Sequence, residues 1–385
     1  MADDDSFTVT QHRTWFSRFG DSVAGVIVGL LLFAVSFVVL FWNESRAVDA
    51  ITALDLGAKT VVSVSAERVD PANQGRLIHL SGPVTVPAAL EDKQFRVSAA
   101  NALRLSRQVE MYQWVETEEQ KTEKSVGGGE TTTTTYRYSR QWREGAVESS
   151  RFKRPEGHHN PAMHHTSRTI DAHGARIGAF TLDHSQITQL DAFEPLPMTG
   201  DTPAPPGFRW VGEQLYRGTS PQDPQVGDLR VSFSVVPATS LSVVAAQSGS
   251  TLAEYTTTQG YGINLAAIGT HTAAAMFTRA KQDEATLTWI LRGAGFLLML
   301  FGLMLMSSPL HWLASLLPLL ESVVSAATFI MALAVAIPLT LVTIALAWLT
   351  YRPLLAGGLI LGGLAAAFII KRMAGKSGSA ILERK

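Results

Sequence analysis

Three long apolar runs near the C-terminus, between Leu287 and Ile370, constrain this chain more than any other feature. They hold stretches of 28, 30 and 18 residues without Lys, Arg, Asp or Glu, and these stretches are separated by Glu321 and Arg352. About 20 apolar residues cross the hydrocarbon of a bilayer, and a backbone exposed to lipid must form its own hydrogen bonds. We therefore predict three transmembrane helices here, at residues 286–307, 322–350 and 353–370.

A fourth apolar run lies near the N-terminus. Residues 22–43 carry no charge and end in Trp42 and Asn43, whereas a cleaved signal peptide has a shorter apolar core and a small-residue cleavage site. We interpret this run as an uncleaved span. Residues 44–285 hold segments rich in Val, Ile and aromatic residues that are broken by Gly and Pro, as is typical of strands. The predicted fold class is α+β, a four-span membrane protein with a large β-rich extracytoplasmic domain.

Basic residues near the ends of the spans predict the orientation. The tail at 371–385 carries five Lys or Arg residues, whereas the connection at 308–321 carries none. The positive-inside rule then places the tail in the cytoplasm. Four spans put the polar segment at 1–21 on the same side, and we expect its first residues to be disordered. The last soluble piece, from Ala266 to Ala285, is alanine-rich and predicts a helix that runs into the second span.

Small and aromatic residues in the predicted spans are candidates for roles in the membrane. GxxxG spacing lets helices approach closely, and it occurs twice, at Gly25 with Gly29 and at Gly358 with Gly362. No acidic residue lies inside any predicted span, so Arg292 is expected to snorkel outward rather than to serve an ion path. Candidate anchors at the outer interface are Trp289, Arg292, Trp348 and Tyr351.

A β-hairpin is predicted around the run Gly127-Gly128-Gly129, because two β-prone arms flank these glycines. Folding about Gly128 brings aromatic and oppositely charged residues together, which stabilises antiparallel pairs. The predicted pairs are Trp114 with Trp142, Glu116 with Arg140, and Glu119 with Arg137. Both arms are polar on both faces, so we expect the hairpin to project and either to contact a partner or simply to be solvated.

Metal, cofactor and nucleic-acid binding find little support. Four histidines lie between residues 158 and 165, and His158 and His159 are the candidate ligands, but no carboxylate or cysteine lies within this run. Gly157 and Pro161 favour a structural turn instead. The chain has no cysteine, and its net charge of −1 provides no general basic face. We expect no metal, no cofactor and no nucleic acid.

Several blocks in matching order resemble the LUMA family, also called transmembrane protein forty-three. They are FWNESRAV at 41–48, GRLIHLSGP at 75–83, VEMYQWVE at 109–116, GHHNPAM at 157–163, VGDLRVSFS at 226–234, WILRGAGFLLMLFGLMLM at 289–306 and LTLVTIALAWLTYRPL at 339–354. The resemblance implies one N-terminal span, a large lumenal domain and three C-terminal spans. It also implies self-association and residence in the endoplasmic reticulum and inner nuclear membrane for eukaryotic members.

The absence of cysteine and the short tails are similar to a bacterial member, for which the corresponding place is the inner membrane with a periplasmic domain. The chain contains no GxSxG, HExxH, Walker or dinucleotide-binding motif, so we expect it not to be an enzyme. The leading hypothesis is a scaffold or assembly factor that binds lipid, copies of itself and other membrane proteins. The alternatives are an oligomeric channel or transport component and, third, a metal-dependent extracytoplasmic enzyme.

Overall fold

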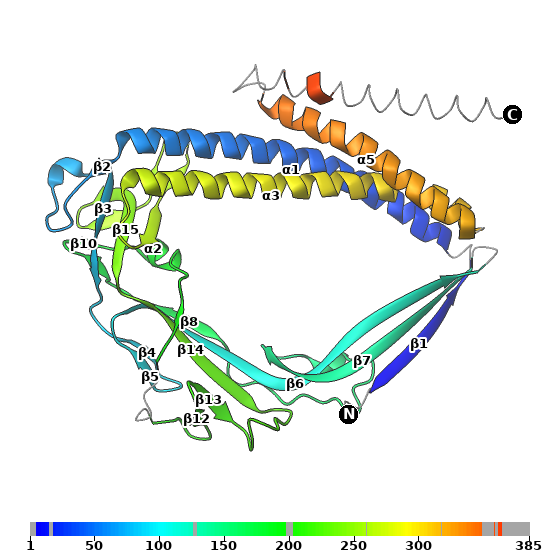
Figure 1. Cartoon of the computed structure of the whole chain (residues 1–385), viewed down its shortest axis with the longest axis horizontal. Coiled ribbons are helices and arrows are strands. Elements are labelled where there is room, and N and C mark those ends of the chain that lie inside the picture. The colour runs from blue at the N-terminus through cyan, green and yellow to red at the C-terminus, as the bar shows by residue number, and fades with distance from the viewer. Residues whose placement is uncertain are drawn as a thin grey trace. The chain divides into compact units, whose positions relative to one another are not determined.

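The protein forms two compact units, each assembled from segments that are distant in the sequence (Figure 1). Unit 1 comprises Met1–Thr8, Ala53–Glu119 and Thr135–Ala280, and unit 2 comprises Val9–Thr52, Gln120–Thr134 and Lys281–Lys385. The structure is a computed structural model, and the residues that it describes are 5–14, 18–125, 129–197, 203–258, 260–316, 318–348, 358 and 361–363.

The larger of two main sheets has eight strands. Its order is β1-β7-β6-β14-β13-β12, with β11 paired to β14 and β8 paired to β6. The antiparallel β6–β14 pair sets Val109 opposite Val231, and alternate residues of β14 are buried, as the pleat of a half-buried strand requires. The bounds are β1 (Ser6–Arg13), β6 (Ala102–Lys124), β7 (Glu130–Glu144), β8 (Arg168–Asp171), β11 (Glu194–Pro195), β12 (Arg209–Val211), β13 (Gln214–Arg217) and β14 (Leu229–Pro237).

The second main sheet has seven strands in the order β19-β15-β16-β10-β9-β3-β2, with a further pairing of β15 to β3. Its strands are β2 (Val62–Ser63), β3 (Leu77–Thr85), β9 (Arg176–Ile177), β10 (Phe180–Thr181), β15 (Ser240–Ser248), β16 (Thr251–Ala253) and β19 (Leu265–Ile268). Two small hairpins, β4 (Leu90–Asp92) with β5 (Val97–Ala99) and β17 (Tyr255–Thr256) with β18 (Gly262–Ile263), and the short helix α2 (His184–Thr188) complete unit 1.

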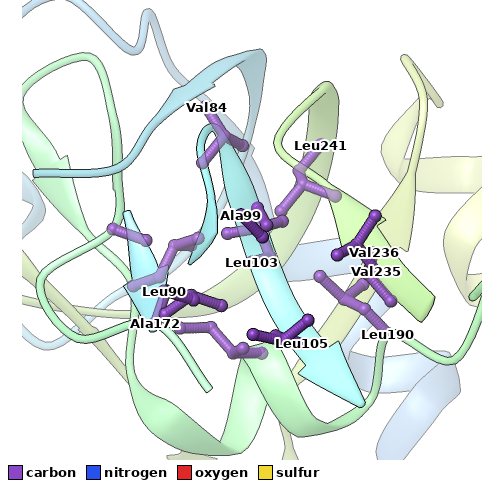
Figure 2. Packing of buried hydrophobic residues seen from close by; sticks show 14 of the residues in the cluster. Val84, Leu90, Ala99, Leu103, Leu105, Ala172, Leu190, Val235, Val236 and Leu241 are labelled. Atoms are coloured by element: carbon purple, nitrogen blue, oxygen red, sulfur yellow. The ribbon is translucent and has the colours of Figure 1, made fainter. Parts of the chain in front are cut away.

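One hydrophobic core joins the two main sheets of unit 1. Leu103 and Leu105 of β6 pack with Val236 of β14 and with Leu241 of β15, and all four side chains are buried (Figure 2). Burying each such side chain stabilises the fold by roughly 1.5–3 kcal/mol relative to leaving it exposed. The alternation of apolar residues in these strands therefore accounts for the β-rich domain.

Unit 2 is mainly helical. Within the part of the chain that the structure describes, three helices are long and apolar enough to cross a membrane, over Ser22–Thr60, Ala273–Met306 and Ser322–Trp348. They lie in α1 (Arg18–Thr60), α3 (Ala273–Met306) and α5 (Pro318–Trp348), and α4 (Ser308–Ala314) follows α3. The prediction of apolar membrane helices beside a large β-rich domain is confirmed to this extent. Of the predicted span at 353–370, the structure describes only residues 358 and 361–363, and these four are helical. The tail at 371–385 lies outside the described residues.

Two helix boundaries differ from the prediction. The 43 residues of α1 extend about 65 Å at 1.5 Å per residue, so the helix continues past residue 43 to Thr60 before the first strand of the β-rich domain. The predicted helix from Ala266 instead starts at Ala273, because residues 265–268 form β19 and pair with β15. The alanine content of residues 265–268 favours a helix, but hydrogen bonding to the edge of β15 makes them a strand.

The N-terminal residues Ser6–Arg13 form an edge strand, so the expectation of disorder is wrong for residues 6–11. The main-chain oxygen of Asp5 also accepts a hydrogen bond from the Tyr138 amide at 3.0 Å. The side of the membrane on which residues 1–21 lie stays a prediction.

Candidate functional site

A buried carboxylate connects the three helices of unit 2. Glu44 of α1 is 0% exposed, and its two oxygens accept hydrogen bonds from Nε and Nη2 of Arg292 on α3, at 2.6 and 2.7 Å. The indole Nε1–H of Trp348 on α5 donates to the same carboxylate. The Arg292 guanidinium also lies over the ring of Trp289, at 4.8 Å from its centroid. One side chain from each helix therefore meets at a single point.

This arrangement corrects the expectation for Arg292. Glu44 is the first residue after the predicted span at 22–43, and it supplies the acidic partner that the sequence interpretation did not find. The Arg292 side chain is 16% exposed and pairs through its bidentate edge, so it does not snorkel to water. Removing one partner of a buried pair costs roughly 3–5 kcal/mol, because the other charge is left uncompensated.

A second polar contact lies further along the same two helices. Arg46 of α1 donates to Glu284 of α3 at 2.6 Å, and Asn43 Nδ2 donates to the Thr288 carbonyl at 3.2 Å. The signs of the charges alternate on both helices, since α1 offers Glu44 then Arg46 and α3 offers Glu284 then Arg292. This pattern fixes one register between α1 and α3 and opposes slippage by a turn.

Small residues let the backbones of α1 and α3 touch. A Cβ atom added at Gly29 would lie 2.7 Å from the Gly302 carbonyl oxygen and 2.7 Å from the Met306 amide nitrogen. At Gly25 it would lie 2.7 Å from Ser308 Oγ. Glycine is therefore needed at position 29 for the helices to approach this closely.

The other predicted membrane residues are described only in part. A Cβ atom added at Gly358 or Gly362 would meet nothing within 4 Å among the described atoms. Tyr351 lies outside the described residues. Trp289 is 69% exposed, whereas Trp348 is engaged with Glu44 and Arg292.

The β6–β7 hairpin forms, but its aromatic and charged residues meet different partners from those predicted. The Arg140 guanidinium lies 5.4 Å from the Trp114 ring centroid, and Trp142 packs at 5.4 Å against Tyr112 rather than against Trp114. Glu116 accepts a hydrogen bond from the Tyr138 hydroxyl at 2.7 Å. In each of these contacts, one partner lies two residues away in sequence from the partner that was predicted. The predicted ion pair between Glu119 and Arg137 is present, at 3.6 Å.

His158 occupies a buried aromatic site on this hairpin. Its ring stacks on Tyr138 with centroids 3.9 Å apart and meets Trp114 edge to face at 4.8 Å. Nδ1 lies 2.9 Å from the Arg154 carbonyl oxygen, and Nε2 lies 2.7 Å from Asp5 Oδ2. Burial, together with the hydrogen bond to Glu116, raises the pKa of Tyr138 to about 12.

The two candidate metal ligands do not converge. His158 is buried and both of its ring nitrogens are engaged, whereas the neighbouring His159 is exposed. Among the described residues, no group of three His, Cys, Asp or Glu side chains is placed to hold a metal ion. Neither histidine is assigned here as a metal ligand.

Sequence reasoning missed several residues of these sites. The Asn160 side chain accepts a hydrogen bond from the Trp114 amide at 2.7 Å and donates one to the Trp114 carbonyl at 3.0 Å, so it ties the His158 loop to β6. The sequence did not indicate that Asp5 or Tyr138 belongs to this site, because both lie in stretches without alternating apolar residues. Glu44 lies at the edge of one apolar run and Arg292 inside another, but their sequence positions do not show that the two side chains meet.

Comparison with known proteins identifies relatives over almost the whole chain. The family model described as "Transmembrane protein 43" matches residues 111–353. The proteins named "Transmembrane protein 43" of Rattus norvegicus and Homo sapiens are 37% and 36% identical over 368 residues, covering 92% of this chain and 91% of theirs. The "Transmembrane protein 43 homolog" of Drosophila melanogaster is 31% identical over 346 residues, covering 88% and 91%. No solved structure matches the chain. The chain belongs to the transmembrane protein 43 family.

Proposed function

We propose that this membrane protein is a non-enzymatic scaffold or assembly factor that organises other membrane proteins. The observation that supports this function is the long hairpin arm of β6 and β7. Residues 117–123 of β6 are exposed along consecutive positions, so both faces of this strand meet solvent. A strand of 23 residues that continues beyond the core adds no buried apolar area there. Its main chain and its polar side chains are suited to contact with another protein.

Apolar residues on the helices support binding to lipid and to further copies of the chain. Ile27 and Val38 of α1 are 65% and 67% exposed, and Ile330 of α5 is 63% exposed. Side chains of this kind are stable against acyl chains or against a neighbouring apolar helix. The membrane helices would thus hold the scaffold in the bilayer, and the arm would hold the partner.

Purification in mild detergent followed by native mass analysis tests this function. We expect a homo-oligomer or a complex with a second membrane protein. Deleting residues 120–134 and joining the strands through Asn-Gly should abolish partner binding while the far-UV spectrum of the β-rich unit persists. A control of full length, in which the exposed Glu213 outside the arm is replaced by Ser, should keep the partner. A wild-type protein that is strictly monomeric and free of partners would contradict a scaffold.

We also propose residence in a bacterial inner membrane with residues 44–285 in the periplasm. The chain contains no cysteine, so single cysteines report sidedness cleanly. Gln222→Cys should react with a membrane-impermeant maleimide in intact cells. Protection of Gln222→Cys until the cells are permeabilised would contradict this placement.

A further inference from the structure

An exposed serine and a buried histidine lie side by side where β2 pairs with β3. The two strands are parallel, and their register sets Ser63 beside His79 (Figure 1). Ser63 Oγ lies 3.2 Å from His79 Nδ1. Ser63 is an exposed residue, whereas His79 is only 8% exposed. A reagent in solution can therefore reach the serine, while protein atoms surround the imidazole beside it.

The second ring nitrogen of His79 determines where its proton lies. Nε2 is 2.9 Å from the His271 carbonyl oxygen, which can only accept a hydrogen bond. The proton of the neutral ring is therefore on Nε2, and the lone pair of Nδ1 accepts from the Ser63 hydroxyl. Burial lowers the pKa of His79 below its usual 6.5, and the hydrogen bond to the His271 carbonyl opposes this only in part. The imidazole is thus neutral at pH 7.

Neighbouring hydroxyls hold this arrangement without competing for Nδ1. Ser81, two residues along β3, lies 3.4 Å from His79 Nε2 and 2.7 Å from Ser242 Oγ on β15. Ser242 donates to the Gly269 carbonyl at 2.8 Å and accepts from the His271 amide at 2.8 Å. These hydrogen bonds fix the main chain of His271, and with it the carbonyl that orients the imidazole.

Together these residues have the geometry of a nucleophile and its general base. A serine hydroxyl is a weak nucleophile at neutral pH, and a base within about 2.6–3.2 Å activates it by accepting its proton. A third group commonly orients the base, as the His271 carbonyl orients His79. The exposed hydroxyl, the neutral imidazole and the orienting carbonyl are therefore the parts that activate a serine for nucleophilic attack.

We propose that Ser63 is an acyl-acceptor site, at which His79 acts as general base while the serine takes an acyl group from an activated ester or thioester. Ser63 Oγ forms a bond to the acyl carbon as the bond from that carbon to the leaving oxygen or sulfur breaks. The proton passes from Oγ to His79 Nδ1 and then to the leaving group. The products are an acyl-serine and a free alcohol or thiol. One acyl group per chain requires no turnover, and this inference does not depend on the scaffold function.

Acetylation of the full chain in detergent by p-nitrophenyl acetate tests this site. General-base assistance contributes about 10²–10⁴-fold, so peptide mapping should show acetylation of Ser63 at least about 100-fold faster than that of Ser65. Ser65 is the matched comparison, because it is an exposed serine of the same segment. Ser65→Ala should leave the rate at Ser63 unchanged, and Ser63→Ala should remove the fast phase. Equal rates at the two serines of the wild type would overturn the proposal.

His79→Gln removes the base but keeps a donor. The glutamine amide can donate toward the His271 carbonyl but cannot take a proton from Ser63. The acetylation rate at Ser63 should therefore fall about 100-fold or more, while near-UV circular dichroism shows that the β-rich unit is folded. An unchanged rate in this folded variant would show that His79 has only a structural role.

The pH profile of the wild type tests the base without any variant. The rate at Ser63 should fall as pH drops through the lowered pKa of His79, because the protonated ring has no lone pair at Nδ1. It should stay constant from pH 7 to 8, where acetylation by hydroxide assistance alone would rise. Among the described residues, the hydrogen bonds around His79 come from Ser63, Ser81 and the main chain of His271, without a carboxylate, lysine or arginine. His271→Gln, which removes the other titratable side chain, should keep the profile. A rate that rises steadily from pH 7 to 8 would overturn the proposal.

Discussion

Each unit of the protein contains an arginine–carboxylate pair with a nearly inaccessible carboxylate, and these two pairs are stabilised in different ways. In unit 1, Arg107 Nη1 lies 2.6 Å from Asp92 Oδ2, and the side chains are 6% and 3% exposed. In unit 2, Arg292 and Glu44 are 16% and 0% exposed. Both arginines also lie 4.8 Å from an aromatic ring centroid, that of Phe95 or of Trp289. The two pairs differ in the other hydrogen bonds that their members form.

The β-rich unit satisfies its pair with main-chain groups. Arg107 also donates twice to the Thr166 carbonyl, and Asp92 Oδ1 accepts from the amides of Gln94 and Phe95. Backbone N–H groups inside a helix already donate to the preceding turn, so the interiors of α1, α3 and α5 offer no free amide donor to Glu44. In unit 2 a side chain, the indole of Trp348, donates the additional hydrogen bond to the Glu44 carboxylate. Helical membrane units therefore depend on specific side chains where a loop-rich domain can use its backbone.

The largest expected effect follows from breaking the pair in unit 2. Arg292→Met leaves Glu44 buried without a charge partner and should lower the free energy of unfolding by roughly 3–5 kcal/mol. Reversible unfolding in mixed micelles measures this change. The double variant Glu44→Gln with Arg292→Met should recover part of the loss, because no charge then stays buried. Equal stability of Arg292→Met and wild type would contradict the assigned pair.

Breaking the pair in unit 1 should cost less. Arg107→Met leaves Asp92 with its two amide donors. We therefore expect the free energy of unfolding to fall by about 3 kcal/mol, the lower end of the range for broken buried pairs. Thermal unfolding followed by near-UV circular dichroism reports on the β-rich unit. A loss larger than that of Arg292→Met would reverse the comparison and show that main-chain donors do not compensate.

The contact between α1 and α3 gives an intermediate effect. Gly29→Leu would push a side chain into the Gly302 and Met306 backbones and should cost about 1–3 kcal/mol through overpacking. Gly20→Leu is the matched control, since a Cβ atom at position 20 meets nothing within 4 Å. The two variants are compared by unfolding in mixed micelles. Equal stabilities would show that α1 and α3 do not touch at Gly29.

The smallest effect is expected from pH in unit 1. The pKa of Tyr138 is raised from 10.0 to about 12, so its neutral form stabilises the fold fully below pH 10. This contribution is lost as pH rises from about 10 toward 12, because the unfolded chain ionises first. Tyr138→Phe should therefore show a smaller fall in unfolding temperature over that range. The pKa of Tyr216 is also raised to about 12, so the unfolding temperature of the variant should still fall in part over this range.

Composition alone predicted the apolar helices and the β-rich class, because hydrocarbon excludes charge over whole stretches and strands need alternating apolar residues. The sequence determined the register of the β6–β7 hairpin less well. A shift of two residues keeps every side chain on its original face, so the pattern that paired Trp114 with Trp142 fits equally well with Arg140 opposite Trp114. In the structure, the cation–π contact of Arg140 with Trp114 favours the second pairing.

The missed features share a physical cause. The β1 strand buries almost nothing, so it lacks the apolar period that reveals a strand, and its stability comes from pairing with β7. Glu44 and Arg292 lie 248 residues apart, and nothing local to either residue indicates the other. Tertiary pairing of this kind is visible only once the helices are placed together.

The separation of Glu44 from Arg292 also sets a time interval during synthesis. A ribosome adds about 5–20 residues per second, so the 248 intervening positions take roughly 12 to 50 s. Throughout this interval α1 carries an acid at its membrane edge without its arginine. The first helix must therefore wait near the insertion site, or keep Glu44 in water, until α3 is made. The three helices then assemble only after most of the chain has been translated.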